Sequence, residues 1–369
     1  MGAPLPYDVF DSGGNLLLHK GYVVTDLRQV EALVKRGLYA DHSIPNCGHA
    51  HSPLHGAQRK GNLSVLQMIN HVNSRLEHTL PNLSREFNAE AKIFEIAKLI
   101  YSAVELNSDI ALACILLNQS SGMYTVRHCT DTAIVSILVA RTMKKPIDEI
   151  MSVTAAALTM NIDMLTYQER LQRKEVALTE RELEILHQHP RNGVDTLRQA
   201  GVRDQEWLSY VLHHHENEDG TGYPNRVAGK DIPQNAKIIS LADRYCARVS
   251  ARSYRKSLLP NTALRDMFID QGKSIDPMLA AYFIKELGLY PPGTLVRLKN
   301  MEIGVVTQKG ATATTPVVHA VIGPGGTLLQ KNTIRDTGRD VYAIQEVLHE
   351  KKLTMRFEMN KLWGEEADP

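Results

Sequence analysis

Residues 213–224 read HHHENEDGTGYP, and this stretch carries most of the information in the sequence. Adjacent histidines at the end of a helix can direct two imidazole rings towards one point. Gly220 and Gly222 allow the following backbone to turn tightly and to approach other groups closely, and Pro224 stiffens its exit. The pattern fits a metal site beside a loop that faces a ligand. From composition alone, a solvated helix end followed by a turn is the alternative.

The sequence around this stretch has a helical pattern. Apolar residues recur at helical spacing through residues 63–288 without strand alternation, which predicts an all-α domain of stacked helices. Thr179 and Glu182 form a capping box that opens one of these helices. Asp204 is predicted to cap another, with Trp207 facing inward.

A further helix is predicted over residues 84–105, with Ser84 as its N-cap and Phe87 on its inward face.

The two ends of the chain lack this continuous helical pattern and are predicted to contain strands. Residues 1–40 predict a small α/β module, with a strand pair over 7–18 and a helix over 25–36, and residues 41–62 read as a linker. Residues 289–369 begin with the helix-breaking Pro291-Pro292-Gly293 and predict a small β-rich module. Its expected strands lie at 295–298, 303–306 and 316–322.

Composition excludes several classes of protein. The 369 residues carry a formal net charge of +1, whereas a nucleic-acid-binding chain usually has a basic surplus. The four cysteines form no CxxC pair and read as free thiols in a reducing compartment. The start of the chain, MGAPLPYDVF, lacks the features of a signal peptide, and the apolar run at 110–117 is too short to span a bilayer. A cytoplasmic protein is therefore predicted.

The string His-His-Glu followed by Asp-Gly-Thr-Gly-Tyr-Pro resembles the signature of the HD-GYP family, bacterial signalling proteins that hydrolyse cyclic di-GMP. The resemblance extends over roughly residues 90–288. It includes single histidines before the motif, an Ala-Asp pair after it and a stretch similar to Arg-Pro-Tyr-Arg at 252–255. The metal ligands that it implies are His128, His189, His214, His215 and Asp243. The ligand-binding residues that it implies are Asp219, Gly220, Gly222, Tyr223, Pro224, Arg252 and Arg255.

The sequence departs from the family at the His-Asp dyad. Thr159 and Met160 stand at the dyad positions, and Asp163 replaces a lysine that would reach a phosphate. The resemblance then implies that one metal site keeps only His128 and Asp243. The site with three histidines is complete enough to hold one divalent ion, such as iron, manganese or zinc. Asp163 lies one helical turn after Thr159, so it is a candidate replacement ligand.

Two functional hypotheses follow from the missing dyad. The favoured one is a regulator that binds cyclic di-GMP, or a partner such as a GGDEF-type cyclase, without turnover, because phosphodiester cleavage depends on the second metal. The alternative is a metal-dependent cyclic di-GMP phosphodiesterase with a reduced or altered metal site. A purely structural interaction module is a third, weaker hypothesis. The sequence makes no prediction of the oligomeric state.

Overall fold

The computed structural model describes residues 63–118, 122–171, 174, 176–250, 257–270, 274–349 and 358–369, together with Tyr22 and three short N-terminal strands. The chain divides into two units, residues 1–61 and 62–369. In the first unit, strand β1 (Val9–Phe10) pairs antiparallel with β2 (Leu16–Leu18) and β3 (Tyr39–Ala40). The strand pair predicted near the N-terminus is therefore present. The helix predicted over 25–36 and the predicted linker lie outside the described residues.

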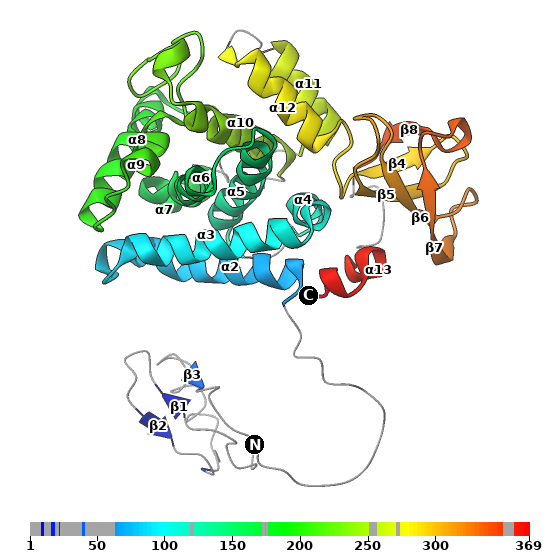
Figure 1. The fold of residues 1–369 in the computed structure, drawn as a ribbon, viewed down its shortest axis with the longest axis horizontal. Coiled ribbons are helices and arrows are strands. Elements are labelled where there is room, and N and C mark those ends of the chain that lie inside the picture. The colour runs from blue at the N-terminus through cyan, green and yellow to red at the C-terminus, as the bar shows by residue number, and fades with distance from the viewer. Residues whose placement is uncertain are drawn as a thin grey trace. The chain divides into compact units, whose positions relative to one another are not determined.

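The second unit is mainly helical, as the sequence predicts (Figure 1). Within its described residues, the first eleven α-helices are α2 (Val65–Thr79), α3 (Ala89–Leu106), α4 (Ser108–Leu117), α5 (Tyr124–Thr142), α6 (Ile147–Thr159), α7 (Leu165–Leu171), α8 (Glu180–Gln199), α9 (Gln205–His213), α10 (Gln234–Val249), α11 (Pro260–Asp270) and α12 (Pro277–Leu287). Short 3₁₀ turns join them, including η1 (Leu80–Arg85), η2 (Ile162–Met164) and η3 (Gly229–Asp231).

Helix α5 is the centre of this unit. Nearly every residue from Tyr124 to Ala140 is buried, because α6 and α10 pack along it and α2, α3 and α12 also contact it. A helix surrounded in this way needs apolar residues on most faces rather than on one stripe. It also leaves few places for a polar side chain, so the buried His128 on α5 needs a partner within the fold.

Two predicted helix starts have different outcomes. The capping box at Thr179 is present: its hydroxyl accepts from the backbone N–H of Glu182, whose carboxylate reaches back to the Thr179 N–H at 2.7 Å. Ser84, by contrast, does not cap a helix, because residues 80–85 form η1 and α3 begins only after Asn88. The prediction that Phe87 faces inward is also wrong, since this side chain is fully exposed in the connection before α3.

The C-terminal sheet confirms the predicted β-rich character of this region. All its pairings are antiparallel, in the order β7-β6-β5-β4-β8. The strands are β4 (Leu295–Leu298), β5 (Ile303–Gln308), β6 (Val317–Ile322), β7 (Leu328–Asp336) and β8 (Ile344–Val347), with η5 (Asp340–Tyr342) before the last. The first three match the predicted strands, and the sequence analysis did not anticipate β7 and β8.

The sheet and the helices form one compact unit. Gly293 fits against α4, because a Cβ at this position would lie 3.0 Å from the Cα of Ala113. After the sheet, α13 (Asn360–Trp363) and η7 (Gly364–Ala367) return to the helical part. There, Asn107 donates to the Glu366 carboxylate at 2.7 Å, while Trp363 donates to the carbonyl of Thr307 in β5.

Within the described residues, no single helix has both the length and the apolar character to cross a membrane. The successive helices α3 and α4 reach those criteria only as a pair, and they bend by 108° at the break between them.

Candidate metal centre

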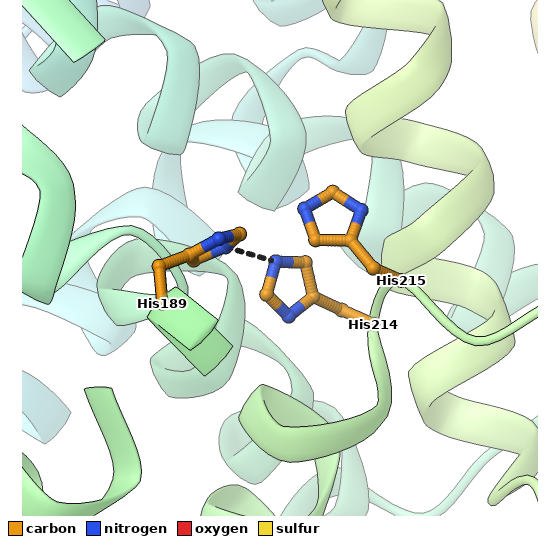
Figure 2. Close-up of side chains that lie close together, drawn as sticks. All are labelled: His189, His214 and His215. Carbon is orange, nitrogen blue, oxygen red and sulfur yellow. Dashed lines mark hydrogen bonds between the residues drawn. The ribbon is translucent and has the colours of Figure 1, made fainter. Parts of the chain in front are cut away.

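Three histidines from two neighbouring helices point their rings towards one another (Figure 2). His189 lies in the middle of α8, His214 is the C-cap of α9 and His215 follows it. One ligand atom from each of the three lies within 4.8 Å of those of the other two. The sequence prediction that these histidines form one cluster therefore agrees with their placement.

Hydrogen bonds fix the tautomers of two of these rings. Nδ1 of His189 lies 2.6 Å from the carbonyl of Leu186, and Nδ1 of His214 lies 2.7 Å from the carbonyl of Val211. Because a carbonyl oxygen only accepts, each Nδ1 must carry a hydrogen, which leaves the Nε2 lone pairs exposed to each other at 3.3 Å. Histidines that bind a metal through one nitrogen commonly donate the other N–H in this way. The two facing Nε2 lone pairs, from His189 and His214, are therefore suited to bind a divalent cation.

Burial keeps the three rings neutral. The pKa of His189 falls to about 3, mainly because the ring is buried and secondly because His214 is close. Burial likewise lowers the pKa of His214, and it holds the pKa of His215 well below its usual range together with the two neighbouring imidazoles. Neutral imidazoles are the form that binds a metal, so the site requires no deprotonation at neutral pH.

Asp243 and His128 lie in the same cavity as this cluster. The cavity has a volume of about 440 Å³, and its lining includes both residues together with His189 and His215. Asp243 Oδ1 and His128 Nε2 are 2.6 Å apart. Burial opposes ionisation of Asp243, but the hydrogen bond to His128 and the nearby histidines hold the pKa of this carboxyl well below its usual range. The carboxylate is therefore ionised beside the three histidines.

The loop after His215 is held against the histidines by its own backbone. Glu216 is buried, and its Oε1 accepts from the backbone N–H groups of Asn225 and Arg226 at 2.7 and 3.1 Å. The Tyr223 ring stacks on His215 with centroids 4.7 Å apart. Of the predicted ligand-binding loop residues, Tyr223 lines the cavity. The described lining does not include Asp219, Gly220, Gly222 or Pro224.

Asp219 and Gly222 have structural roles in this loop. Asp219 Oδ1 accepts from the backbone N–H and the hydroxyl of Thr221, at 3.1 and 2.6 Å, and so closes a local turn. Gly222 packs directly on the backbone of residues 215–217. Arg252 and Arg255, the other predicted ligand-binding residues, lie outside the described residues.

The residues at the dyad positions have become part of the core. Thr159 is fully buried, donates its hydroxyl hydrogen to the carbonyl of Ala155 at 2.7 Å and accepts from Trp207 Nε1 at 2.8 Å. Met160 is fully buried in the main apolar core. Neither is among the described residues that line the cavity with the histidines.

Asp163, the predicted replacement ligand, lies outside the cavity that holds the histidines. It is exposed, accepts from the side-chain amide of Asn192 at 3.1 Å and lines a separate cavity of about 500 Å³. The prediction that it might join the metal site is therefore not supported by its position. The physical reason is that α6 ends at Thr159, so the chain through η2 no longer keeps the helical spacing that would place both residues on one face.

Sequence reasoning missed three polar residues of the cavity. Tyr124 stacks on His128 with ring centroids 5.7 Å apart, and Gln168 and Lys174 also line the cavity. Tyr124 precedes His128 by one helical turn, a spacing that places the two on one face of α5. Lys174 follows α7 and belongs to no sequence motif, so no local pattern marked it.

Gly222 offers a test of how the loop positions His215. A Cβ at residue 222 would overlap the backbone nitrogen of Asn217 and lie 2.5 Å from the His215 carbonyl oxygen. We expect Gly222→Ala to displace His215 and to weaken metal binding by about tenfold or more. Competition with a chelating dye measures this affinity. Gly325→Ala is the control, because nothing lies within 4 Å of its added Cβ. Equal affinities in the two variants would contradict the role of Gly222.

The neutral histidines also predict how stability depends on pH. Without metal, the unfolded imidazoles have a pKa of about 6.5 and bind protons that the folded cluster does not. Because folding lowers the pKa of these histidines, their contribution to the free energy of unfolding is fully present above about pH 6.5. It is lost as the pH falls towards the pKa in the folded state, which is about 3 for His189. Each histidine contributes up to about 1.4 kcal/mol per pH unit.

Urea unfolding in chelator between about pH 7.5 and pH 5.5 measures this loss of stability. His189→Gln is the comparison, since it removes one buried imidazole and is expected to flatten the dependence. If the free energy of unfolding of this variant depends on pH as steeply as that of the parent, the histidine cluster is not the source of the pH dependence.

Comparisons with known proteins agree with this site. The family model described as HD domain matches residues 112–279. The chain is 30% identical over 239 residues to the cyclic di-GMP phosphodiesterase PA4108 of Pseudomonas aeruginosa, which covers 64% of this chain and 58% of that protein. It is 24% identical over 239 residues to the cyclic di-GMP phosphodiesterase PdeB of Borreliella burgdorferi, covering 64% of this chain and 62% of that protein. The chain thus spans about three fifths of the length of these relatives.

A solved structure shares the fold. The HDG"Y"P protein Bd1817 of Bdellovibrio bacteriovorus aligns with a TM-score of 0.53 and 13% identity, over 76% of this chain and 94% of that chain. The HD-domain match contains all five predicted metal ligands, from His128 to Asp243. The family predicted from the sequence is therefore confirmed for the matched stretch: residues 112–279 of this chain form an HD domain, and the relatives that extend beyond it are cyclic di-GMP phosphodiesterases.

Proposed function

We propose that this chain is a metal-dependent cyclic di-GMP phosphodiesterase that works with a reduced metal centre. The observation that carries the proposal is the pair of Nε2 lone pairs of His189 and His214, 3.3 Å apart, in a cluster with His215. The names of the curated relatives support this enzymatic alternative better than the regulator that the sequence analysis favours.

The three histidines would hold one divalent ion, and a bound ion would supply a water of lowered pKa and positive charge near the phosphate. Asp243 is ionised beside them, so its carboxylate would serve as an anionic ligand to the ion or accept a hydrogen bond from the attacking water. The hydrogen bond with His128 orients that carboxylate. The stacked ring of Tyr223 limits the movement of His215 and excludes water from one side of it.

A second candidate function is the regulator without turnover, and the placement of Thr159 and Met160 favours it. Both are buried core residues, and Thr159 is bonded to Trp207, so neither supplies the described cavity with a carboxylate that would bridge two ions. In that case the domain would bind cyclic di-GMP, or a GGDEF-type cyclase, and transmit the binding state to another part of the protein.

One experiment separates these candidates. Elemental analysis of protein purified without chelator is expected to return at most one divalent ion per chain. Turnover of cyclic di-GMP with added Mn²⁺, Fe²⁺ or Zn²⁺ is expected to be slow and to stop in chelator. Binding with no turnover would favour the regulator. Two or three bound ions would show that the second site is intact, and the absence of any bound ion would overturn the metal-dependent phosphodiesterase.

A further inference from the structure

The lining of the cavity that holds the histidines carries a single cationic side chain. Among the described lining residues, Lys174 is the only lysine or arginine, and Asp243 is the only carboxylate. Lys174 follows α7, where its backbone N–H donates to the carbonyl of Leu171 at 3.1 Å and turns the chain towards α8. The lining of the cavity therefore contains one negative group, neutral imidazoles and one positive group.

The Lys174 ammonium is held in place by a carboxylate that is itself fixed. It pairs with Glu182 Oε2, the oxygen that also accepts from the Thr179 N–H at 2.7 Å and the Thr179 hydroxyl at 2.9 Å. These contacts, the lysine first, lower the pKa of Glu182 to about 2, so the carboxylate stays ionised. The capping box of α8 thus anchors the lysine as well as starting the helix.

The ion pair leaves the ammonium with hydrogens to spare. An ammonium has three N–H donors, and a single carboxylate oxygen takes one of them. The Lys174 side chain is 23% exposed, which keeps it accessible to a ligand in the cavity. The nearby carboxylate of Asp163 does not compete, because it is bonded to Asn192 and lines the other cavity.

A ligand that spans such a cavity needs an anionic group. The histidines are suited to a cation, while the lysine is suited to the oxygens of a phosphate, which form charge-assisted hydrogen bonds with an ammonium. We propose that Lys174 binds a phosphate oxygen of the ligand in this cavity. The identity of the ligand rests on the proposed function, but the assignment of the lysine rests on the cavity.

The test compares four variants of the full chain loaded with Mn²⁺. Lys174→Gln removes the charge and Lys174→Arg keeps it, while Glu182→Gln removes the anchoring charge but retains a capping-box residue. Lys145→Gln is the matched control, because Lys145 forms a similar ion pair with Glu149 at 3.0 Å, with comparable exposure, away from the cavity. Titration calorimetry measures binding of cyclic di-GMP and, separately, of inorganic phosphate.

We expect Lys174→Gln to weaken cyclic di-GMP binding by about tenfold to a hundredfold, with metal content unchanged. The remaining affinity should depend less on ionic strength than that of the parent, which a merely structural role would not produce. Lys174→Arg should recover most of the affinity, and Lys145→Gln should match the parent. Glu182→Gln should lose less affinity than Lys174→Gln, because it loosens the anchor of the ammonium but keeps the positive charge that binds the phosphate.

The outcomes separate the two proposals. If Lys174→Gln binds cyclic di-GMP as tightly as the parent, the lysine is not the phosphate-binding group, while the proposed function stands. An equal loss in Glu182→Gln and Lys174→Gln also overturns the inference, because it would mean that the ion pair only maintains the wall. If the parent binds neither cyclic di-GMP nor phosphate, both proposals fail.

Discussion

Replacing His214 with glutamine is expected to abolish metal binding. His214 is fully buried, and its Nε2 faces that of His189 at 3.3 Å, so its removal takes away one of the two opposed lone pairs. Two remaining histidines rarely hold a divalent ion against water. We expect the metal content to fall from about one ion per chain to nearly none and turnover to fall to background. Elemental analysis and the metal-induced rise in melting temperature measure the effect.

The neighbouring histidine provides a matched control. His213 directs its Nδ1 back to the carbonyl of Ser209 at 2.8 Å and is not part of the cluster. His213→Gln should therefore keep the ion, the turnover and the metal-dependent rise in melting temperature. Full metal content in His214→Gln, or its loss in His213→Gln, would show that the centre is built from other residues.

The elements that could be predicted are those that local chemistry specifies. Thr179 and Glu182 carry both halves of a capping box, and Asp204 caps α9 with its carboxylate at 2.9 Å from the Trp207 N–H. Such starts depend on residues three positions apart and need no knowledge of the fold. The pair His214 and His215 can be recognised in the same way, because two adjacent residues also form a local pattern that needs no knowledge of the fold.

The elements that could not be predicted depend on tertiary packing. Ser84 and Phe87 fit a helical pattern, but the chain uses η1 and a short connection before Asn88 caps α3. Burial of an apolar side chain is decided by what packs on it, and nothing within the described residues covers Phe87. Local spacing alone does not contain that information.

The same limit applies to the site. Asp163 is close in sequence to the dyad positions, but η2 turns it to a different cavity. Lys174 is far from every motif residue in sequence, but the turn after α7 brings it to the cavity with His189. A residue that belongs to a motif can be recognised from the sequence. A residue that only lines the cavity can be recognised once the positions of the helices around the cavity are known.

Restoring the dyad is expected to change stability and metal content more than any other substitution. In Thr159→His with Met160→Asp, the histidine loses the Thr159–Trp207 hydrogen bond and crowds the core, and the aspartate becomes a buried charge at a position with no exposure. In chelator we expect the free energy of unfolding to fall by about 3–5 kcal/mol, the range for an uncompensated buried charge. Urea unfolding measures it.

Added divalent metal should reverse much of this loss. The changed residues end α6 beside Asn161, which lines the cavity with His128 and Asp243, so a carboxylate there can join those two ligands around a second ion. Binding to the folded state alone stabilises it by about 2.7 kcal/mol at a hundredfold excess over the dissociation constant. Thr159→His with Met160→Asn is the control: it carries the same crowding without the charge, so it should be destabilised but gain little from metal. If both double variants respond to metal alike, or neither takes up a second ion, then His128 and Asp243 no longer converge on a metal position, and the site has lost more than its dyad.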